Sequence, residues 1–247
     1  TVVHFDLDGY RDLIITNGFP KDVTDLDFVD YNSNAYAYAS KGFMNDNIPS
    51  VKLHNYAFRN RGDLTFESMG EKWGITQNSF SNGGAYGDLD NDGDLDYVVN
   101  NINDPASLFR NNLIDDRNKK SKNIDQPNWL SIRLKGDSLN PMGLGSLVEI
   151  HYGKGKKQFW EHSIYRGYLS SVQALAHFGL GKNQVVEKII VTWPNQVQQI
   201  LDGVEANQVL EIDYSKAKRQ NLAPPLPPPV QPWFSNVTAS LGLNYIH

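Results

Sequence analysis

The chain has 247 residues, a formal net charge of −5 at pH 7, 40% hydrophobic residues and no cysteine. This length and hydrophobic content are enough for two domains with substantial cores. The acidic charge is concentrated in loops, which argues against nucleic acid as a partner. No run of about 18 apolar residues is present, so we expect no membrane-spanning segment in this chain. Disulfides contribute nothing, and the cysteine count leaves the redox compartment open.

The chain begins with a candidate cation-binding loop, which runs from His4 to Asp12 and enters a predicted strand at Leu13–Thr16. Aspartates stand at positions 3, 5 and 9 of this loop, and Gly9 stands at position 6, where calcium loops turn sharply. Imidazole, at position 1, is a poor ligand for calcium, which prefers oxygen. We therefore expect a weaker site, or one that takes water as its first ligand. Its ligands would be the side chains of Asp6, Asp8 and Asp12 and the backbone carbonyl of Tyr10.

Residues 19–50 form an insertion, after which the motif Phe58-Arg59-Asn60 resumes the pattern. Within the insertion, Pro20–Asp25 could open a helix, and three aromatic side chains could provide its apolar face. We therefore predict a helical insertion. The aromatic residues are Tyr36, Tyr38 and Phe43.

The most informative segment is DLDNDGDLD, which places five aspartates in nine residues and Gly93 at the sixth position. Carboxylates this close repel one another unless a cation lies among them, and their spacing matches a calcium loop. Magnesium fits less well because it prefers few protein ligands. Val99 stands at position 12, and the predicted strand Leu95–Val99 follows, so the loop is not an EF-hand. We predict calcium bound by the side chains of Asp88, Asp90, Asp92 and Asp96 and the carbonyl of Asp94, with a solvated acidic turn as the alternative.

Both loops belong to a longer internal repeat. Phe58–Asn60 recurs as Phe109–Asn111, and the pattern F-x7-G-aliphatic that begins at Phe66 recurs at Phe234. Repeats of strands in fixed order, without an intervening helix, are typical of the blades of a β-propeller.

These residues resemble FG-GAP/VCBS repeats, whose blades carry calcium loops of this kind. The resemblance covers residues 1–18 and about 51–112. It implies that the central loop binds calcium, whereas His4 departs from the family pattern in the first loop. We predict repeat blades over residues 1–113.

A polar connector over residues 114–127 precedes a second region, residues 128–214, that contains short strands separated by turns rich in glycine and asparagine. This pattern is typical of a β-sandwich or a small barrel, so the predicted class of the whole chain is all-β. The predicted strands of this region are 129–134, 147–152, 158–162, 185–193, 197–201 and 208–214.

The second region is similar to the ASPIC/UnbV domain through four motifs. They are Asn140-Pro-x-Gly-x-Gly145, Arg166–Ser171, His177-Phe-Gly-Leu-Gly181 and Trp193-Pro194. The arrangement of repeats followed by this domain is similar to bacterial relatives of cartilage acidic protein. The resemblance implies an exported, calcium-binding surface or matrix protein whose molecular activity is poorly defined.

We find no catalytic motif, and we expect no enzyme activity. The glycine-rich segments 153–157 and 179–181 lack the spacing of phosphate-binding and dinucleotide-binding loops. We interpret His177 as a residue that hydrogen-bonds across a strand end, and the glycines that follow it as turn residues with positive φ. A pair of carboxylates for glycoside hydrolysis stays open as an alternative, because its separation is spatial.

Residues 215–232 form a proline-rich linker, and residues 233–247 open a further repeat. Since two blades cannot close a propeller, we expect this chain to be a piece of a longer protein. We also expect metal removal to destabilise the repeats and to leave the region from Trp129 to Tyr214 little changed.

Two functional hypotheses follow. The first is a calcium-binding scaffold or adhesion module, extracellular or at a cell surface, including the outer membrane or periplasm of a bacterium, with a protein or glycan partner. Extracellular calcium modules bind at about 10⁻⁴–10⁻³ M, which suits such a location. The alternative is a carbohydrate-binding or carbohydrate-processing protein in which Trp160, Tyr165 and Tyr168 stack on sugars. Core packing is the competing interpretation of these aromatic residues.

Overall fold

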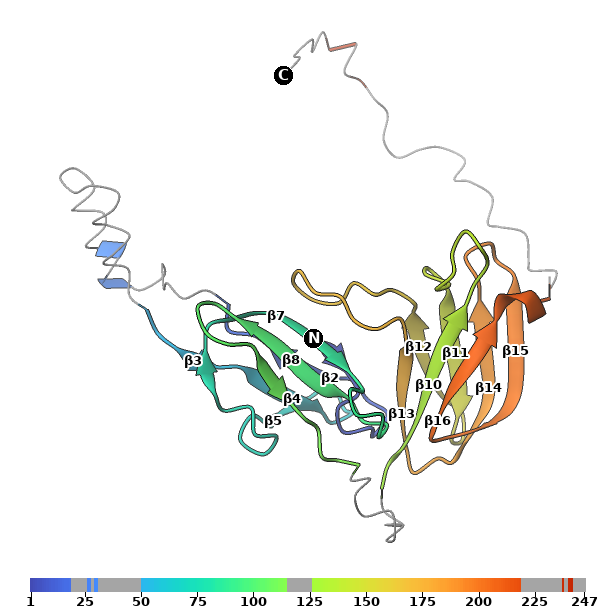
Figure 1. Ribbon diagram of the computed structural model, residues 1–247, viewed down its shortest axis with the longest axis horizontal. Helices are drawn as coiled ribbons and strands as arrows, with labels where there is room; N and C mark the ends of the chain where they lie inside the picture. Colours follow the sequence, from blue (N-terminus) through green and yellow to red (C-terminus); the bar gives the residue numbers. More distant parts are fainter. Residues whose placement is uncertain are drawn as a thin grey trace.

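The computed structural model describes residues 1–18, 26–27, 29–30, 50–114, 126–218, 237 and 240–241. These residues are built almost entirely from β-strands in several sheets, which confirms the predicted all-β class. Figure 1 shows two groups of sheets side by side. We call residues 1–18 and 50–114 the repeat region, and residues 126–218 the sandwich region.

The repeat region contains two antiparallel sheets and a short strand pair. The first sheet has the order β1-β2-β4-β5, and the second has the order β7-β8-β9. The strands of the first sheet are β1 (Val2–Val3), β2 (Asp12–Ile15), β4 (Tyr56–Asn60) and β5 (Phe66–Ser68). The strands of the second are β7 (Ser81–Gly87), β8 (Asp96–Asn101) and β9 (Ser107–Phe109). The pair consists of β3 (Leu53–His54) and β6 (Asn78–Ser79).

The two sheets are copies of one unit at the level of strand register. Each acidic loop joins the first two strands of its sheet, and the aspartate at position 9 pairs with the residue just before the loop, as Asp12 with Val3 and Asp96 with Gly87. The next residue pairs with the phenylalanine of the FRN motif in both sheets. The internal repeat inferred from sequence therefore has a structural counterpart. The first FRN motif forms the last three residues of β4, and the second begins at the last residue of β9. Neither motif is itself a hairpin turn.

The sandwich region packs two sheets face to face. One has the order β13-β10-β16, with β10 and β16 parallel, and the other has the order β12-β11-β14-β15. Trp160 meets Phe178 across the sheets, with ring centroids 6.2 Å apart. The first sheet contains β10 (Asn128–Lys135), β13 (Ala176–Gly181) and β16 (Gln208–Asp213). The second contains β11 (Leu147–Tyr152), β12 (Lys156–Glu161), β14 (Val185–Thr192) and β15 (Gln198–Glu205).

Strand β13 has two different faces, and both are buried. Because side chains alternate along a strand, Ala176, Phe178 and Leu180 point into the sandwich core. The alternate residues, beginning with His177 and Gly179, lie on the outer face and are covered by the repeat region. Buried apolar residues of both regions belong to one contiguous core cluster. The two regions are therefore packed together and not merely tethered.

Several predicted segments can now be compared with the structure. The strands predicted in residues 128–214 are confirmed within a few residues at each end, but β13 lies where the sequence predicts turns. In the insertion, the described residues 26–27 and 29–30 have helical backbone, and the rest of it lies outside the described residues. Most of the connector, the proline-rich linker and the last segment also lie outside them. A short 3₁₀ helix, Tyr214–Lys216, follows β16. No helix among the described residues is long and apolar enough to cross a membrane.

Candidate metal centre

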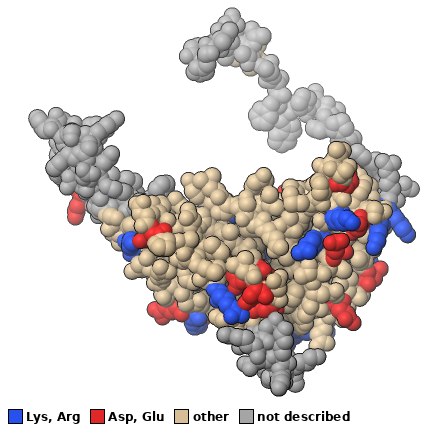
Figure 2. Space-filling view, in the orientation of Figure 1, with Lys and Arg blue, Asp and Glu red and all other residues tan. Residues whose placement is uncertain are grey.

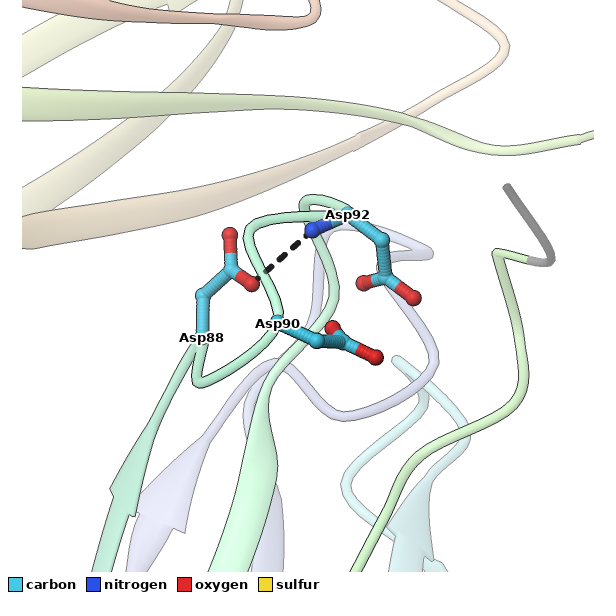
Figure 3. A group of neighbouring side chains, drawn as sticks. All are labelled: Asp88, Asp90 and Asp92. Carbon is cyan, nitrogen blue, oxygen red and sulfur yellow. Dashed lines mark hydrogen bonds between the residues drawn. The ribbon is translucent and has the colours of Figure 1, made fainter. Parts of the chain in front are cut away.

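The loop between β7 and β8 brings three carboxylates together. Ligand atoms of Asp88, Asp90 and Asp92 all lie within 4.8 Å of one another, and no other group of three such side chains is found among the described residues. Figure 3 shows these side chains around the loop, whose tip points toward the strands of the sandwich region. Asp90 is exposed, Asp88 is half-buried and Asp92 is 7% exposed. The three residues that sequence places at positions 1, 3 and 5 therefore meet in space.

The loop is shaped by backbone conformation and by its own carboxylates. Gly93 has φ of 103° and Asn91 has φ of 60°, both in the left-handed region that glycine and asparagine tolerate best. The carboxylate of Asp88 accepts hydrogen bonds from the backbone N–H groups of Asp92 and Gly93, both at 3.1 Å (Figure 3 marks the first). Asp92 in turn accepts from the N–H of Asp94 at 3.1 Å. These bonds fix the turn and leave further carboxylate lone pairs for a ligand.

Asp96 closes the base of the loop. One of its oxygens accepts from the N–H of Leu89 at 3.0 Å, and the other accepts from the N–H of Asn111 at 2.9 Å. The asparagine of the second FRN motif is thereby tied to the loop. Asp94 is predicted to bind the ion through its backbone carbonyl. Its side chain is fully buried and accepts a hydrogen bond from the N–H of Ile114 at 2.7 Å. Both aspartates thus have structural roles besides any role as ligands.

Burial makes the negative charge of this loop costly. It raises the pKa of Asp88 to about 6, with a further contribution from the charge of Asp92. It likewise raises the pKa of Asp94 to about 7 and that of Asp92 above its ordinary value. Partly buried carboxylates that repel one another are stabilised in their charged form by a nearby cation.

Arg110, of the FRN motif, supplies part of the missing positive charge. Its Nη2 lies 2.6 Å from Asp90 Oδ2 but 3.7 Å from Asp92 Oδ2. That Asp92 oxygen is buried and has no hydrogen-bond partner. Asp94 Oδ1 is buried and unpartnered as well. An acidic, oxygen-only donor set with orphaned buried oxygens fits a hard divalent cation such as calcium.

The first loop has the same internal bonds. Asp12 accepts from the N–H groups of Phe5, at 2.9 Å, and Asn60, at 3.1 Å, as Asp96 does in the second loop. Asp8 accepts from the N–H of Tyr10 at 2.8 Å, the counterpart of the bond from Asp94 to Asp92. Gly9 has φ of 102°, nearly that of Gly93.

The first loop differs at position 1 and in its charge balance. His4 is 1% exposed, and its Nδ1–H donates to the backbone carbonyl of Tyr10 at 2.9 Å. That carbonyl is the oxygen predicted to bind a metal. Arg59 lies 2.6 Å from Asp6 and 3.2 Å from Asp8, so both carboxylates already have a cation. Burial lowers the pKa of His4 to about 3, which keeps the imidazole neutral.

Carboxyl groups in the first loop nevertheless show the same electrostatic cost. Burial raises the pKa of Asp6 to about 6 and that of Asp12 to about 7. The arginine and asparagine of the two FRN motifs had no predicted role. Their recurrence at one place after each loop was the signal that could have found them.

The sandwich region covers the tips of both loops. His177 Nε2–H donates to the carbonyl of Gly93 at 3.0 Å, and the ring of Trp129 stacks on His177 with centroids 6.0 Å apart. Gly181 N–H donates to the carbonyl of Leu7 at 2.8 Å. Arg11 donates to the carbonyl of Phe159 and lies over the ring of Trp160. The candidate site is therefore built from two regions, a feature that the spacing of the aspartates could not reveal.

The structure thus describes an all-β protein with an acidic loop at the interface between two regions. Residues 136–219 match the sequence model of the family described as ASPIC and UnbV. The chain is also similar to cartilage acidic protein 1 of Mus musculus, with 28% identity over 202 residues, which cover 74% of this chain and 29% of that protein. The corresponding protein of Homo sapiens is 27% identical over 170 residues, which cover 67% and 24%. That of Xenopus tropicalis is 30% identical over 138 residues, which cover 53% and 19%.

These comparisons support the predicted resemblance to ASPIC/UnbV and a distant relationship to cartilage acidic protein 1. The family match begins in the sandwich region and leaves the acidic loops outside it. The chain spans less than a third of the length of these relatives.

Proposed function

We propose that this chain is a calcium-binding module of a larger scaffold or adhesion protein, and that Asp88, Asp90 and Asp92 are the first ligands of the ion. The observation that carries the proposal is the convergence of these three carboxylates within 4.8 Å, with Asp92 Oδ2 buried and without a hydrogen-bond partner. Asp96 and the carbonyl of Asp94 complete the proposed ligand set. The ion would neutralise a loop that is otherwise electrostatically unfavourable, so its role would be structural.

The repeat region would belong to a β-propeller built from FG-GAP/VCBS blades. The identical register of the two sheets around their loops supports this assignment. The remaining blades would come from other parts of a longer protein. In the first loop, Asp6, Asp8, Asp12 and the carbonyl of Tyr10 would form a weaker site, because the His4 ring and Arg59 already take the place of an ion.

We assign this module to the cell surface or the extracellular space, where calcium is abundant enough for a loop of this type. A protein or glycan is the proposed partner. On the face seen in Figure 2, acidic and basic side chains are interspersed, and no broad basic patch of the kind that binds nucleic acid is visible. The proposed role is non-catalytic.

Titration of the whole chain with calcium, monitored by calorimetry, tests the central site. We expect one ion to bind to the wild type with an affinity that depends on Asp90 and Asp92. A variant with both residues changed to alanine, which removes both side-chain ligands, should lose that ion. Binding of equal stoichiometry and affinity in the variant would place the site elsewhere.

A carbohydrate ligand is the second candidate function, and one observation favours it. Tyr165 and Tyr168 are 74% and 60% exposed on the loop between β12 and β13, where their rings are free to stack on a sugar. Trp160, by contrast, is 4% exposed, which contradicts its predicted role in stacking. Incubation with a glycan panel tests this candidate. Binding that is lost when both tyrosines become alanine would support it, and turnover of any glycan would overturn the non-catalytic role.

A further inference from the structure

The outer face of β13 is shaped to receive the acidic loops. Its residues at alternate positions are His177, Gly179 and Gly181, the H-x-G-x-G of the HFGLG motif. Gly179 does not have positive φ, so a turn does not explain it. A Cβ at this position would lie 2.6 Å from the Cα of Leu7, which is far too close for any backbone atom. The glycine is therefore required for the first loop to touch the strand.

The same face also contacts the second loop, at Gly93. This residue lies between Asp92 and Asp94, and its carbonyl accepts the hydrogen bond from His177. A Cβ on Gly93 would lie 2.0 Å from atoms of the Trp129 ring, so the indole packs directly on the loop backbone. His177 is 1% exposed, and the nearly parallel rings of Trp129 and His177 form one wall. Groups on β10 and β13 therefore hold the acidic loop from outside, in addition to its internal hydrogen bonds.

If the cation binds at Asp88, Asp90 and Asp92, the contacts of His177 and Trp129 with Gly93 must affect its affinity. An ion binds most tightly to a loop whose ligands are already held in position, because less conformational entropy is lost on binding. His177 and Trp129 restrict the peptide that joins two of the proposed ligands. In this arrangement Asp92 Oδ2 is buried and accepts no hydrogen bond, so its lone pairs remain available to an ion.

We propose that His177 and Trp129 are positioning residues of the cation site, and that ion binding and docking of the sandwich region stabilise each other. This inference rests on the proposed calcium function. By thermodynamic linkage, a docked sandwich region that raises ion affinity must itself be held more firmly when the ion is bound. The expectation that metal removal leaves the sandwich region unchanged is replaced by its opposite.

The first test measures calcium affinity of the whole chain by calorimetry for the wild type, His177→Ala and His177→Gln. Alanine removes the donor to Gly93, and we expect affinity to fall by about tenfold, within the usual range of coupling between sites. Glutamine keeps an N–H donor, and we expect it to restore most of the affinity. The matched control is His162→Ala, which removes another buried imidazole of the sandwich region.

The possible outcomes distinguish a failure of the proposed calcium function from a failure of the positioning role of His177. If the wild type binds no calcium, the proposed function and this inference both fail. If the wild type binds calcium and folded His177→Ala binds it equally well, only the inference is overturned. Loss of affinity in His162→Ala equal to that in His177→Ala would overturn it too, because general destabilisation would then account for both.

Hydrogen exchange in the wild-type chain decides the question without any variant. Calcium should slow amide exchange not only in residues 81–114 but also in β10 and β13. Strand β15, at the far edge of the other sheet, should respond least. Slowing that is confined to the repeat region would show that the sandwich region does not sense the ion, and would overturn the proposal.

Discussion

The two acidic loops have the same backbone conformation but differ in the groups that bind their carboxylates and carbonyls. Both have the same strand register, the same glycine turn and the same pair of bonds to the position-9 aspartate. In the first loop, His4 donates directly to the position-7 carbonyl, and Arg59 lies between two carboxylates. In the second, Asp88 accepts from the backbone N–H groups of the turn, and Arg110 lies 3.7 Å from Asp92 Oδ2, which has no hydrogen-bond partner.

The difference shows that different groups can neutralise and hold the same loop conformation. A neutral imidazole and a guanidinium bridge the first loop from within the chain. The second loop has two more carboxylates than the first, with Asp88 in place of the imidazole and Asp94 in place of Tyr10. Its own arginine is therefore not enough. We therefore expect the second loop to depend on an external cation. Removal of that cation should destabilise the second loop more than the first.

The largest expected effect follows from removing two carboxylates of the second loop. At a calcium concentration a hundredfold above Kd, the ion should stabilise the wild type by about 2.7 kcal/mol. Asp90→Ala combined with Asp92→Ala should abolish this gain, because alanine offers no oxygen ligand. Unfolding curves with calcium and with a chelator measure it, and Asp63→Ala combined with Asp202→Ala, at two exposed positions outside both loops, serves as the control. A wild type whose stability does not respond to chelator would contradict the comparison of the loops.

Sequence alone predicted the acidic loops and most strands because their signals are local. Carboxylates at alternate positions around a glycine repel one another within a few residues of chain, which indicates a cation whatever the rest of the fold is. Strand β11 was predicted over its full extent, Leu147–Tyr152. The repeated FRN motif marked equivalent positions that the strand register confirms. What these patterns could not give was the partner of each arginine, since that contact joins residues far apart in the chain.

Two glycine-rich strands were missed for a single physical reason. In β7 (SNGGAYG) and β13 (AHFGLG), glycine is a poor strand former and usually indicates a turn. Here it makes room for a neighbour: Gly84 lies under the ring of Tyr97, and Gly179 lies against Leu7. Close approach of another backbone or ring depends on the tertiary fold, so periodicity cannot predict it. The contact of the candidate cation site with the sandwich region was hidden for the same reason.

The second prediction tests whether the first loop needs its glycine contact on β13. Gly179→Ala places a methyl group against the backbone of Leu7, which cannot move away as a flexible side chain would. We expect a loss of about 1–3 kcal/mol in the free energy of unfolding, typical of overpacking. Gly70→Ala is the control, because its nearest neighbour beyond the chain segment lies at an ordinary 3.7 Å. Equal effects of the two changes on chemical denaturation would refute a special role for Gly179.

The third prediction exchanges the residues at position 1. Asp88→His should weaken calcium binding at the second loop by about tenfold, or 1.4 kcal/mol, because affinity follows the number of charged ligands. His4→Asp should strengthen binding at the first loop, since it adds a carboxylate and removes the bond that occupies the carbonyl of Tyr10. Calorimetry on each variant measures both changes. If His4→Asp gains nothing while Asp88→His abolishes binding, the alignment of the two loops at position 1 is wrong.

The smallest expected effect concerns pH and the imidazole that joins the regions. Burial lowers the pKa of His177 from 6.5 to about 4. Because the unfolded chain then takes up the proton more readily, the stability contributed by neutral His177 is complete above about pH 6.5 and is lost as pH falls toward 4. His4, also buried and neutral, contributes with the same sign from about pH 6.5 down toward pH 3, equally in both proteins. Between pH 7.5 and 6, the free energy of unfolding should therefore fall by somewhat under about 1 kcal/mol more in the wild type than in His177→Gln. Urea denaturation of both proteins across this range, in the presence of chelator, measures the difference, and parallel pH profiles would mean that His177 is not buried as the neutral donor to Gly93.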